Sequence, residues 1–163
     1  MNKTAIVSVL LTVGILMQFV LLVVIVLNVS VFYNNMVLDS FSQQLFNSDI
    51  PEETVILEKH KICGKLNGNG DGMDFLACIL IRSDKTISEL EKHFETLNFM
   101  GAKLSHKTAE LQVLAVTESQ LRSDYLINRD IIFGVELELN RYNYYAIVIY
   151  DGGYWGLLDM RGA

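Results

Sequence analysis

The feature that most constrains this chain is an uncharged, apolar stretch that begins at Ala5 and ends at Tyr33. A helix needs about 20 predominantly apolar residues to cross roughly 30 Å of hydrocarbon. Residues 5–27 form a run of 23, most of them Val, Leu or Ile. The sequence therefore predicts a single N-terminal transmembrane helix, which makes residues 1–33 a membrane anchor with a short cytoplasmic N-terminus.

A buried core helix and a cleaved signal peptide are the two alternatives for this stretch. The remaining chain is too small to cover such a helix on every side. A signal peptide has an apolar region of only about 7–15 residues and ends in a small-x-small site. Here the run is longer, and its best site, Asn28-Val29-Ser30, is poor. An uncleaved anchor is the favoured prediction, and cleavage is the open alternative.

The charges on either side of the span predict its orientation and its partners. Lys3 precedes the span, and the next basic residue is Lys59, which follows several acidic ones. Because Lys and Arg are retained on the cytoplasmic side, we expect the C-terminal domain outside the cell membrane. Beyond the span, 12 basic against 19 acidic residues leave a net charge of −7. Such a domain repels phosphate backbones, so we expect the bilayer and a protein as partners, and no nucleic acid.

Apolar residues at Met36, Phe41 and Leu45 predict that the helix continues past the bilayer as a stalk over residues 34–50. Pro51, the single proline of the chain, marks its end because proline cannot continue a helix interior. A stalk of this kind either packs on its own domain or meets a partner.

The remaining residues, 51–163, predict a small extracytoplasmic α+β domain. Strands over 54–66 and 73–82 form a hairpin, and a capping box at Thr86 and Glu89 begins a helix. A second short helix is expected after Thr117. Further strands are expected over residues 110–116, 130–139, 143–150 and 154–160, with a turn at Asp151-Gly152-Gly153. This order predicts a mostly antiparallel sheet with one or two helices on one face.

Cys63 and Cys78 carry the most testable chemistry. A hairpin register centred on its loop places them directly opposite each other, and Ile62 then faces Ile79. Opposed cysteines on adjacent strands can meet disulfide geometry, and outside the cytoplasm the bond persists. A disulfide is the favoured prediction, and the alternatives are two buried free thiols or a different register.

The hairpin loop is a candidate calcium site. Asn67, Asn69 and Asp71 alternate before Gly72, as oxygen ligands do in the first half of an EF-hand loop. The twelfth position, which needs a bidentate glutamate, is Cys78. A plain Gly/Asn turn is therefore the favoured interpretation, with a weak calcium site as the alternative. We expect no cofactor.

Two further features are candidates for binding. Tyr142, Tyr144, Tyr154 and Trp155 could stack on sugars or dock a protein, although tyrosine is also a common strand residue. Gln18 lies near mid-span, where its amide either bonds a neighbouring helix or is satisfied locally.

Recognisable catalytic patterns do not occur in the sequence. The three histidines are far apart, and neither G-x-S-x-G nor S-x-x-K is present. Acidic pairs such as Glu136 and Glu138 are typical of solvated faces. We therefore expect no enzymatic activity, and the alternative is an enzyme with a site assembled from dispersed residues.

Two stretches, Cys63–Met73 and Leu158–Gly162, are similar to small uncharacterised membrane-anchored proteins of low-GC Gram-positive bacteria. This resemblance implies a bacterial cell-surface setting and carries no activity. In outline the chain also resembles pilin-like subunits, in which a long apolar helix precedes an α+β head. It lacks the glycine before the span and the glutamate five residues into it that pilin assembly needs.

These observations together favour a non-enzymatic bitopic membrane protein whose outer domain binds or regulates a protein partner at the cell surface. The alternative is a surface ligand-binding module for envelope carbohydrate or, weakly, for calcium.

Overall fold

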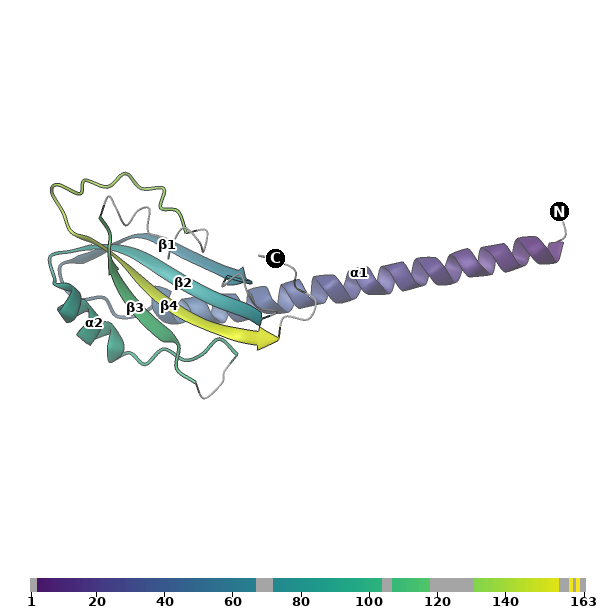
Figure 1. Ribbon diagram of the computed structural model, residues 1–163, viewed down its shortest axis with the longest axis horizontal. Coiled ribbons are helices and arrows are strands. Elements are labelled where there is room, and N and C mark those ends of the chain that lie inside the picture. Colours follow the sequence, from purple (N-terminus) through teal and green to yellow (C-terminus); the bar gives the residue numbers. More distant parts are fainter. Residues whose placement is uncertain are drawn as a thin grey trace.

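The computed structural model describes residues 3–66, 72–103, 107–117 and 131–155, with Asp159 and Arg161; for residues 3–6 and Val9 it describes the backbone alone. The architecture is α+β, as the sequence predicted. One long N-terminal helix is followed by a four-stranded antiparallel sheet with a short second helix (Figure 1). We call the sheet, with the helices and segments that cover it, the head.

Helix α1 (Lys3–Phe46) runs unbroken for 44 residues. At about 1.5 Å per residue it is roughly 66 Å long. Its first part projects away from the head, and its side chains from Leu10 to Val29 are exposed (Figure 1). In the described part of the chain, α1 is the one helix long and apolar enough to cross a membrane.

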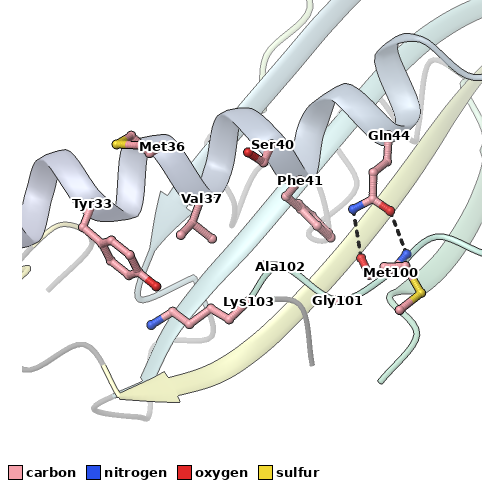
Figure 2. Close-up of a pocket in the computed structure, with 10 residues that line it drawn as sticks. All are labelled: Tyr33, Met36, Val37, Ser40, Phe41, Gln44, Met100, Gly101, Ala102 and Lys103. Atoms are coloured by element: carbon pink, nitrogen blue, oxygen red, sulfur yellow. Dashed lines mark hydrogen bonds between the residues drawn. The ribbon is translucent and has the colours of Figure 1, made fainter. Parts of the chain in front are cut away.

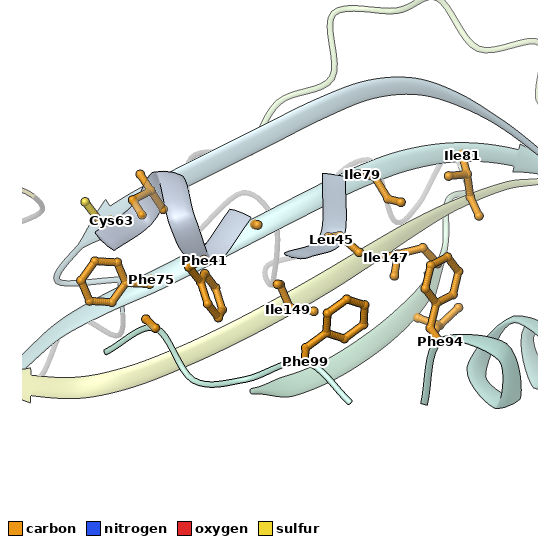
Figure 3. Close-up of a cluster of buried hydrophobic side chains, with 14 of the residues drawn as sticks. Phe41, Leu45, Cys63, Phe75, Ile79, Ile81, Phe94, Phe99, Ile147 and Ile149 are labelled. Atoms are coloured by element: carbon orange, nitrogen blue, oxygen red, sulfur yellow. The ribbon is translucent and has the colours of Figure 1, made fainter. Parts of the chain in front are cut away.

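The last third of α1 belongs to the core of the head. Leu38, Phe41 and Leu45 are 7%, 1% and 0% exposed, because this part of the helix lies across β1 and β2 (Figure 3). Of the two alternatives for residues 34–50, packing on their own domain is therefore the one found. Of the apolar residues that predicted a stalk, Phe41 and Leu45 lie on the face of α1 that contacts the sheet, whereas Met36 is exposed.

The four strands are β1 (Thr54–Gly64), β2 (Gly72–Ser83), β3 (Glu110–Ala115) and β4 (Tyr144–Trp155), in the sheet order β1-β2-β4-β3. Each neighbouring pair is antiparallel. Strands β1, β2 and β3 begin and end within two residues of their predicted bounds. The central strands β2 and β4 are buried on both faces over most of their length, as their Ile- and Val-rich sequences require.

One face of the sheet is covered by α1 and by helix α2 (Ile87–Glu95). The capping box that predicted α2 is present: the Thr86 side chain accepts from the Glu89 amide, and the Thr86 amide donates to Glu89 Oε2 at 2.8 Å. Leu90 and Phe94 are fully buried beneath it. This is the face onto which the sequence predicted one or two helices.

Two predictions for the C-terminal part are wrong. The strand expected over residues 130–139 is not found in the described residues 131–139; instead their apolar side chains Ile131, Phe133 and Leu137 pack across the second face of the sheet. Strand β4 does not turn at residues 151–153 but continues to Trp155. The helix expected after Thr117 and most of the last expected strand lie outside the described residues.

A β-bulge explains why the glycine pair bends β4 without ending it. The register between β2 and β4 shifts between Met73 and Phe75, and Gly153 takes up the extra length with a φ of +83°. The Gly153 amide donates to Asp74 Oδ1 at 3.1 Å. A Cβ on Gly152 would clash with the same carboxylate oxygen and with the Tyr150 hydroxyl group, so a larger residue there would have to displace both side chains.

The predicted disulfide between Cys63 and Cys78 is also wrong. Both thiols are free and buried, and the register pairs Cys63 with Phe75 and Cys78 with His60. The register differs from the expected one by three residues. Because side chains alternate, an odd shift moves a partner to the other face. Cys63 therefore packs under α1 (Figure 3), while Cys78 packs on the second face.

Candidate functional site

A groove of about 430 Å³ lies between α1 and the segment that connects α2 to β3. Figure 2 shows the helix as one wall and residues 100–103 as the other. The groove is lined by Tyr33, Met36, Val37, Ser40, Phe41, Gln44, Met100, Gly101, Ala102 and Lys103. Most of these side chains are apolar, and the groove runs along the helix from the head core to the start of the projecting part of α1.

Hydrogen bonds hold the second wall in place. Gln44 Nε2 donates to the Met100 carbonyl at 3.1 Å, and the Met100 amide donates to Gln44 Oε1 at 2.8 Å (Figure 2). The Ala102 amide donates to the buried Asp151 carboxylate at 2.8 Å. These backbone groups are satisfied within the protein, so what the wall offers to a ligand is mainly its apolar surface.

Lys103 stands at the end of the groove nearest the projecting helix, beside Tyr33 (Figure 2). Its Nζ lies 5.1 Å from the ring centroid of Tyr154 and 5.8 Å from that of Tyr33, within the range of cation–π attraction. Desolvation by burial lowers its pKa. Among the described residues no carboxylate forms an ion pair with Lys103. The ammonium group can therefore receive an anionic group from a ligand.

A second group of polar residues forms hydrogen bonds between α1 and the head at the point where the helix enters the head. Asp159 is 1% exposed and accepts from Asn34 Nδ2 at 2.9 Å and from Arg161 Nε at 2.8 Å. Arg161 also donates to Asn35 Oδ1, and its carbonyl accepts from the Lys65 amide. The hydrogen bonds from Arg161 hold the pKa of Asp159 below its usual value. We call these residues the junction clamp.

Sequence reasoning indicated one wall of the groove, because Met36 and Phe41 belong to the predicted stalk, but it missed the second wall and the junction clamp. The groove needs Gln44 and Met100, which are 56 positions apart, and the clamp needs Asn34 and Asp159, which are 125 apart. The only available signal for the clamp was the polar pair Asp159 and Arg161 near the C-terminus.

The predicted aromatic surface does not form one platform. Tyr144, which is 6% exposed, begins β4 and Tyr142 lies two residues before it, whereas Tyr154 and Trp155 lie at the far end of the strand. Tyr154 packs its ring on Phe75 and donates its hydroxyl to Asp151. Trp155 is the exposed member of the set, at 75%.

The other predicted site residues are dispersed. Asn67, Asn69 and Asp71 lie outside the described residues, so the calcium hypothesis remains a prediction. In the part of the chain that is described, no three His, Cys, Asp or Glu side chains gather as a metal site. Gln18 is exposed on the projecting part of α1, beside Gly14.

Cys63 and Cys78 are buried side chains with free thiols. Burial raises the pKa of the Cys78 thiol to about 12 and is also the main reason that the pKa of Cys63 is raised. Neither thiol is therefore a nucleophile in the folded head.

No protein-family model matches the chain, no curated protein matches it, and no solved structure matches it.

Proposed function

We propose that this chain is a single-pass membrane protein, with its head outside the cell membrane, that binds a protein partner in the groove and catalyses no reaction. The position of the groove carries the proposal. One wall is formed by α1, which continues directly into the apolar span. A membrane-anchored partner can therefore reach the groove while it remains in the bilayer. The single lysine before the span supports the orientation.

The chemistry of the groove favours a polypeptide segment as the ligand. Met36 and Met100 border the groove, one on each wall, and methionine side chains adapt to the shape of varied apolar partners. Lys103 provides one cation at the end near the span. The matching segment has an apolar side chain that fills the groove and a carboxylate that reaches Lys103.

Photo-crosslinking in living cells tests this proposal. A photoreactive amino acid at Ser40, an exposed position in the groove, should capture one protein of defined mass. The same group at Ser88, on the exposed face of α2 at the other end of the head, should not. Lys103→Ala should reduce the yield at Ser40, because it removes the cation without blocking the groove.

Each of these measurements has a result that would contradict the proposal. Equal adducts at Ser40 and Ser88, adducts with lipid only, or a yield that Lys103→Ala leaves unchanged would contradict the groove as the binding site.

A surface ligand-binding module is the second candidate, and the exposure of Trp155 is the observation that favours it. Trp155 is the single tryptophan of the chain, so its fluorescence reports on that site directly. Titration with calcium or with cell-wall fragments should change its emission if the module binds them. An unchanged spectrum at millimolar ligand would remove this candidate.

A further inference from the structure

One side of α1 has a polar residue within the apolar span and exposed apolar residues beyond the span. Gln18, a polar residue, lies in the apolar span, while Phe32 and Met36 lie beyond the span and are 67% and 54% exposed. Gln18 and Met36 are 18 positions apart, which is five full turns at about 3.6 residues per turn. They therefore lie on the same line along the helix, and Phe32 is one turn before Met36.

This line faces away from the head. Leu38, Phe41 and Leu45 mark the side of α1 that packs on the sheet. Figure 2 shows Met36 on the side of the helix opposite Val37 and Phe41, and its side chain is 54% exposed. Because α1 is continuous, the same direction holds for Gln18 within the span.

The positions between these residues complete a seam for helix packing. They follow one another at intervals of four and three residues, the spacing with which helices pair along a left-handed supercoil. The seam consists of Gln18, Leu22, Ile25, Val29, Phe32 and Met36. Its five apolar members are each at least half exposed.

Hydrogen bonding distinguishes Gln18 from the other polar residues of the span. Thr12 donates to the Ser8 carbonyl at 2.9 Å, and Asn28 donates to the Val24 carbonyl at 2.7 Å, so each is satisfied within its own helix. In the described part of the chain the Gln18 amide has no such partner. An unsatisfied amide in hydrocarbon is costly, so Gln18 needs a partner from outside the helix.

The surface beside Gln18 allows close approach. Gly14 lies one turn earlier, and a Cβ added to it would have no neighbouring atom within 4 Å. Together with the side chains around it, Gly14 forms a shallow hollow that reaches Gln18. Small residues at such positions let two helix backbones come near each other in a bilayer.

We propose that α1 pairs with α1 of a second copy of this chain, in parallel, along this seam, with the two Gln18 side chains bonded to each other at mid-span. The proposal rests on α1 crossing the membrane, as proposed above. A primary amide both donates and accepts, so two glutamines across a twofold axis satisfy each other. A second copy is thus a sufficient partner.

Charge and shape also fit a second copy. No charged residue lies between Ala5 and Leu38, and the first one beyond, Asp39, is held by Lys61 in an ion pair of 2.5 Å. The seam therefore does not repel its own copy. Because each head is on the far side of its helix, the two acidic heads point apart.

Oxidative crosslinking of the full chain in neutral lipid vesicles tests the pairing. Val29→Cys places a thiol on the seam, and Leu27→Cys places one two residues away on the opposite side of the helix. Val29→Cys should form a disulfide dimer and Leu27→Cys should not. Cys63 and Cys78 can stay in place because both are buried.

A second measurement addresses the role of Gln18. Energy transfer between labelled copies, followed as lipid dilutes the protein, gives the dissociation constant in the bilayer. Gln18→Leu should raise this constant about 3- to 30-fold, the range expected for one interhelical polar contact. Thr12→Val should leave it unchanged, because Thr12 is satisfied locally.

Three results would overturn the proposal: a chain that is monomeric at every protein-to-lipid ratio, equal crosslinking at both cysteine positions, or a dissociation constant that Gln18→Leu does not raise. Alkaline extraction of the same vesicles shows separately whether α1 is inserted. Loss of insertion would contradict the membrane anchor itself, which separates that failure from a failure of pairing.

Discussion

Asp159 and Arg161 connect three parts of the chain that are distant in sequence: the junction of α1 with the head, the end of β1, and the C-terminal residues. The carboxylate is fully enclosed and is neutralised by a guanidinium group that binds both of its oxygens. These hydrogen bonds add to the apolar packing of α1 at the point where the helix enters the head.

The junction clamp predicts a pH-dependent loss of stability. Because folding lowers the pKa of Asp159, its carboxylate stabilises the folded state above about pH 4 and ceases to do so as the pH falls through the folded-state pKa. At pH 7, Asp159→Asn should cost about 1–3 kcal/mol of unfolding free energy. The difference in unfolding free energy between Asp159→Asn and the native chain should become smaller in acid.

Pulse labelling of the Cys78 thiol during urea titration measures that free energy, because Cys78 is exposed only on unfolding. Glu138→Gln is the matched control, since this carboxylate pairs with Arg141 at 3.6 Å on the open surface. Circular dichroism replaces thiol labelling in acid, where the thiols are protonated. A full effect of Asp159→Asn that persists unchanged at pH 3 would contradict the assignment to the ionised pair.

The two thiols give a second prediction at this scale. In the folded protein, Cys63 and Cys78 should resist a maleimide, because both are buried and burial raises the pKa of each thiol. After denaturation without reductant, mass spectrometry should count two modified thiols. Labelling that requires prior reduction would show a disulfide and contradict the register of β1 and β2.

At the scale of elements, the sequence predicted the features that depend on residues close to one another in the chain. The capping box at Thr86 specified the start of α2, and the apolar strands β1, β2 and β3 were predicted to within two residues. Register was not predictable, because the choice between neighbouring registers depends on which side chains α1 covers. The second wall of the groove was missed for a similar reason, since no short-range signal brings Met100 to Gln44.

Residues 131–143 show the limit of pattern reasoning. Their alternating apolar residues were interpreted as a strand, and the alternation is real, because Ile131, Phe133, Leu137 and Leu139 do pack on the second face of the sheet. An extended segment that lies across a sheet satisfies the same pattern as a strand that joins its edge.

The bulge in β4 gives a prediction for an element. Gly152→Ala should destabilise the head by about 1–3 kcal/mol, because the new methyl group displaces the Asp74 carboxylate from the Gly153 amide. The Cys78 labelling assay gives the value. In an Asp74→Ala background the same substitution should cost less. Equal costs in both backgrounds would show that Asp74 is not the obstacle.

At the scale of the whole molecule, the head and the helix are not separable at residue 51. Leu38, Phe41 and Leu45 fill one face of the sheet, and removal of each such side chain typically costs about 2–5 kcal/mol. Together these losses are comparable with the whole margin of about 5–15 kcal/mol by which domains are stable. We therefore expect the head to need the last part of α1 in order to fold.

Two fragments test this statement. Residues 34–163 keep the junction clamp and the covering turns of α1, and should be soluble with Cys78 protected. Residues 51–163 should aggregate or leave Cys78 reactive, because one face of the sheet is bare. A folded, protected 51–163 fragment would show that α1 only rests on the head.

The continuity of α1 has a mechanical consequence. The helix has no proline and no break between the exposed stretch and the residues packed on the sheet, so α1 has no hinge between the proposed span and the head. Any tilt of the span is then a tilt of the whole head. Transmembrane helices lean further in thinner bilayers to match their apolar length. The height and angle of the groove above the lipid would thus follow bilayer thickness, and the protein would present its binding surface differently in membrane regions of different composition.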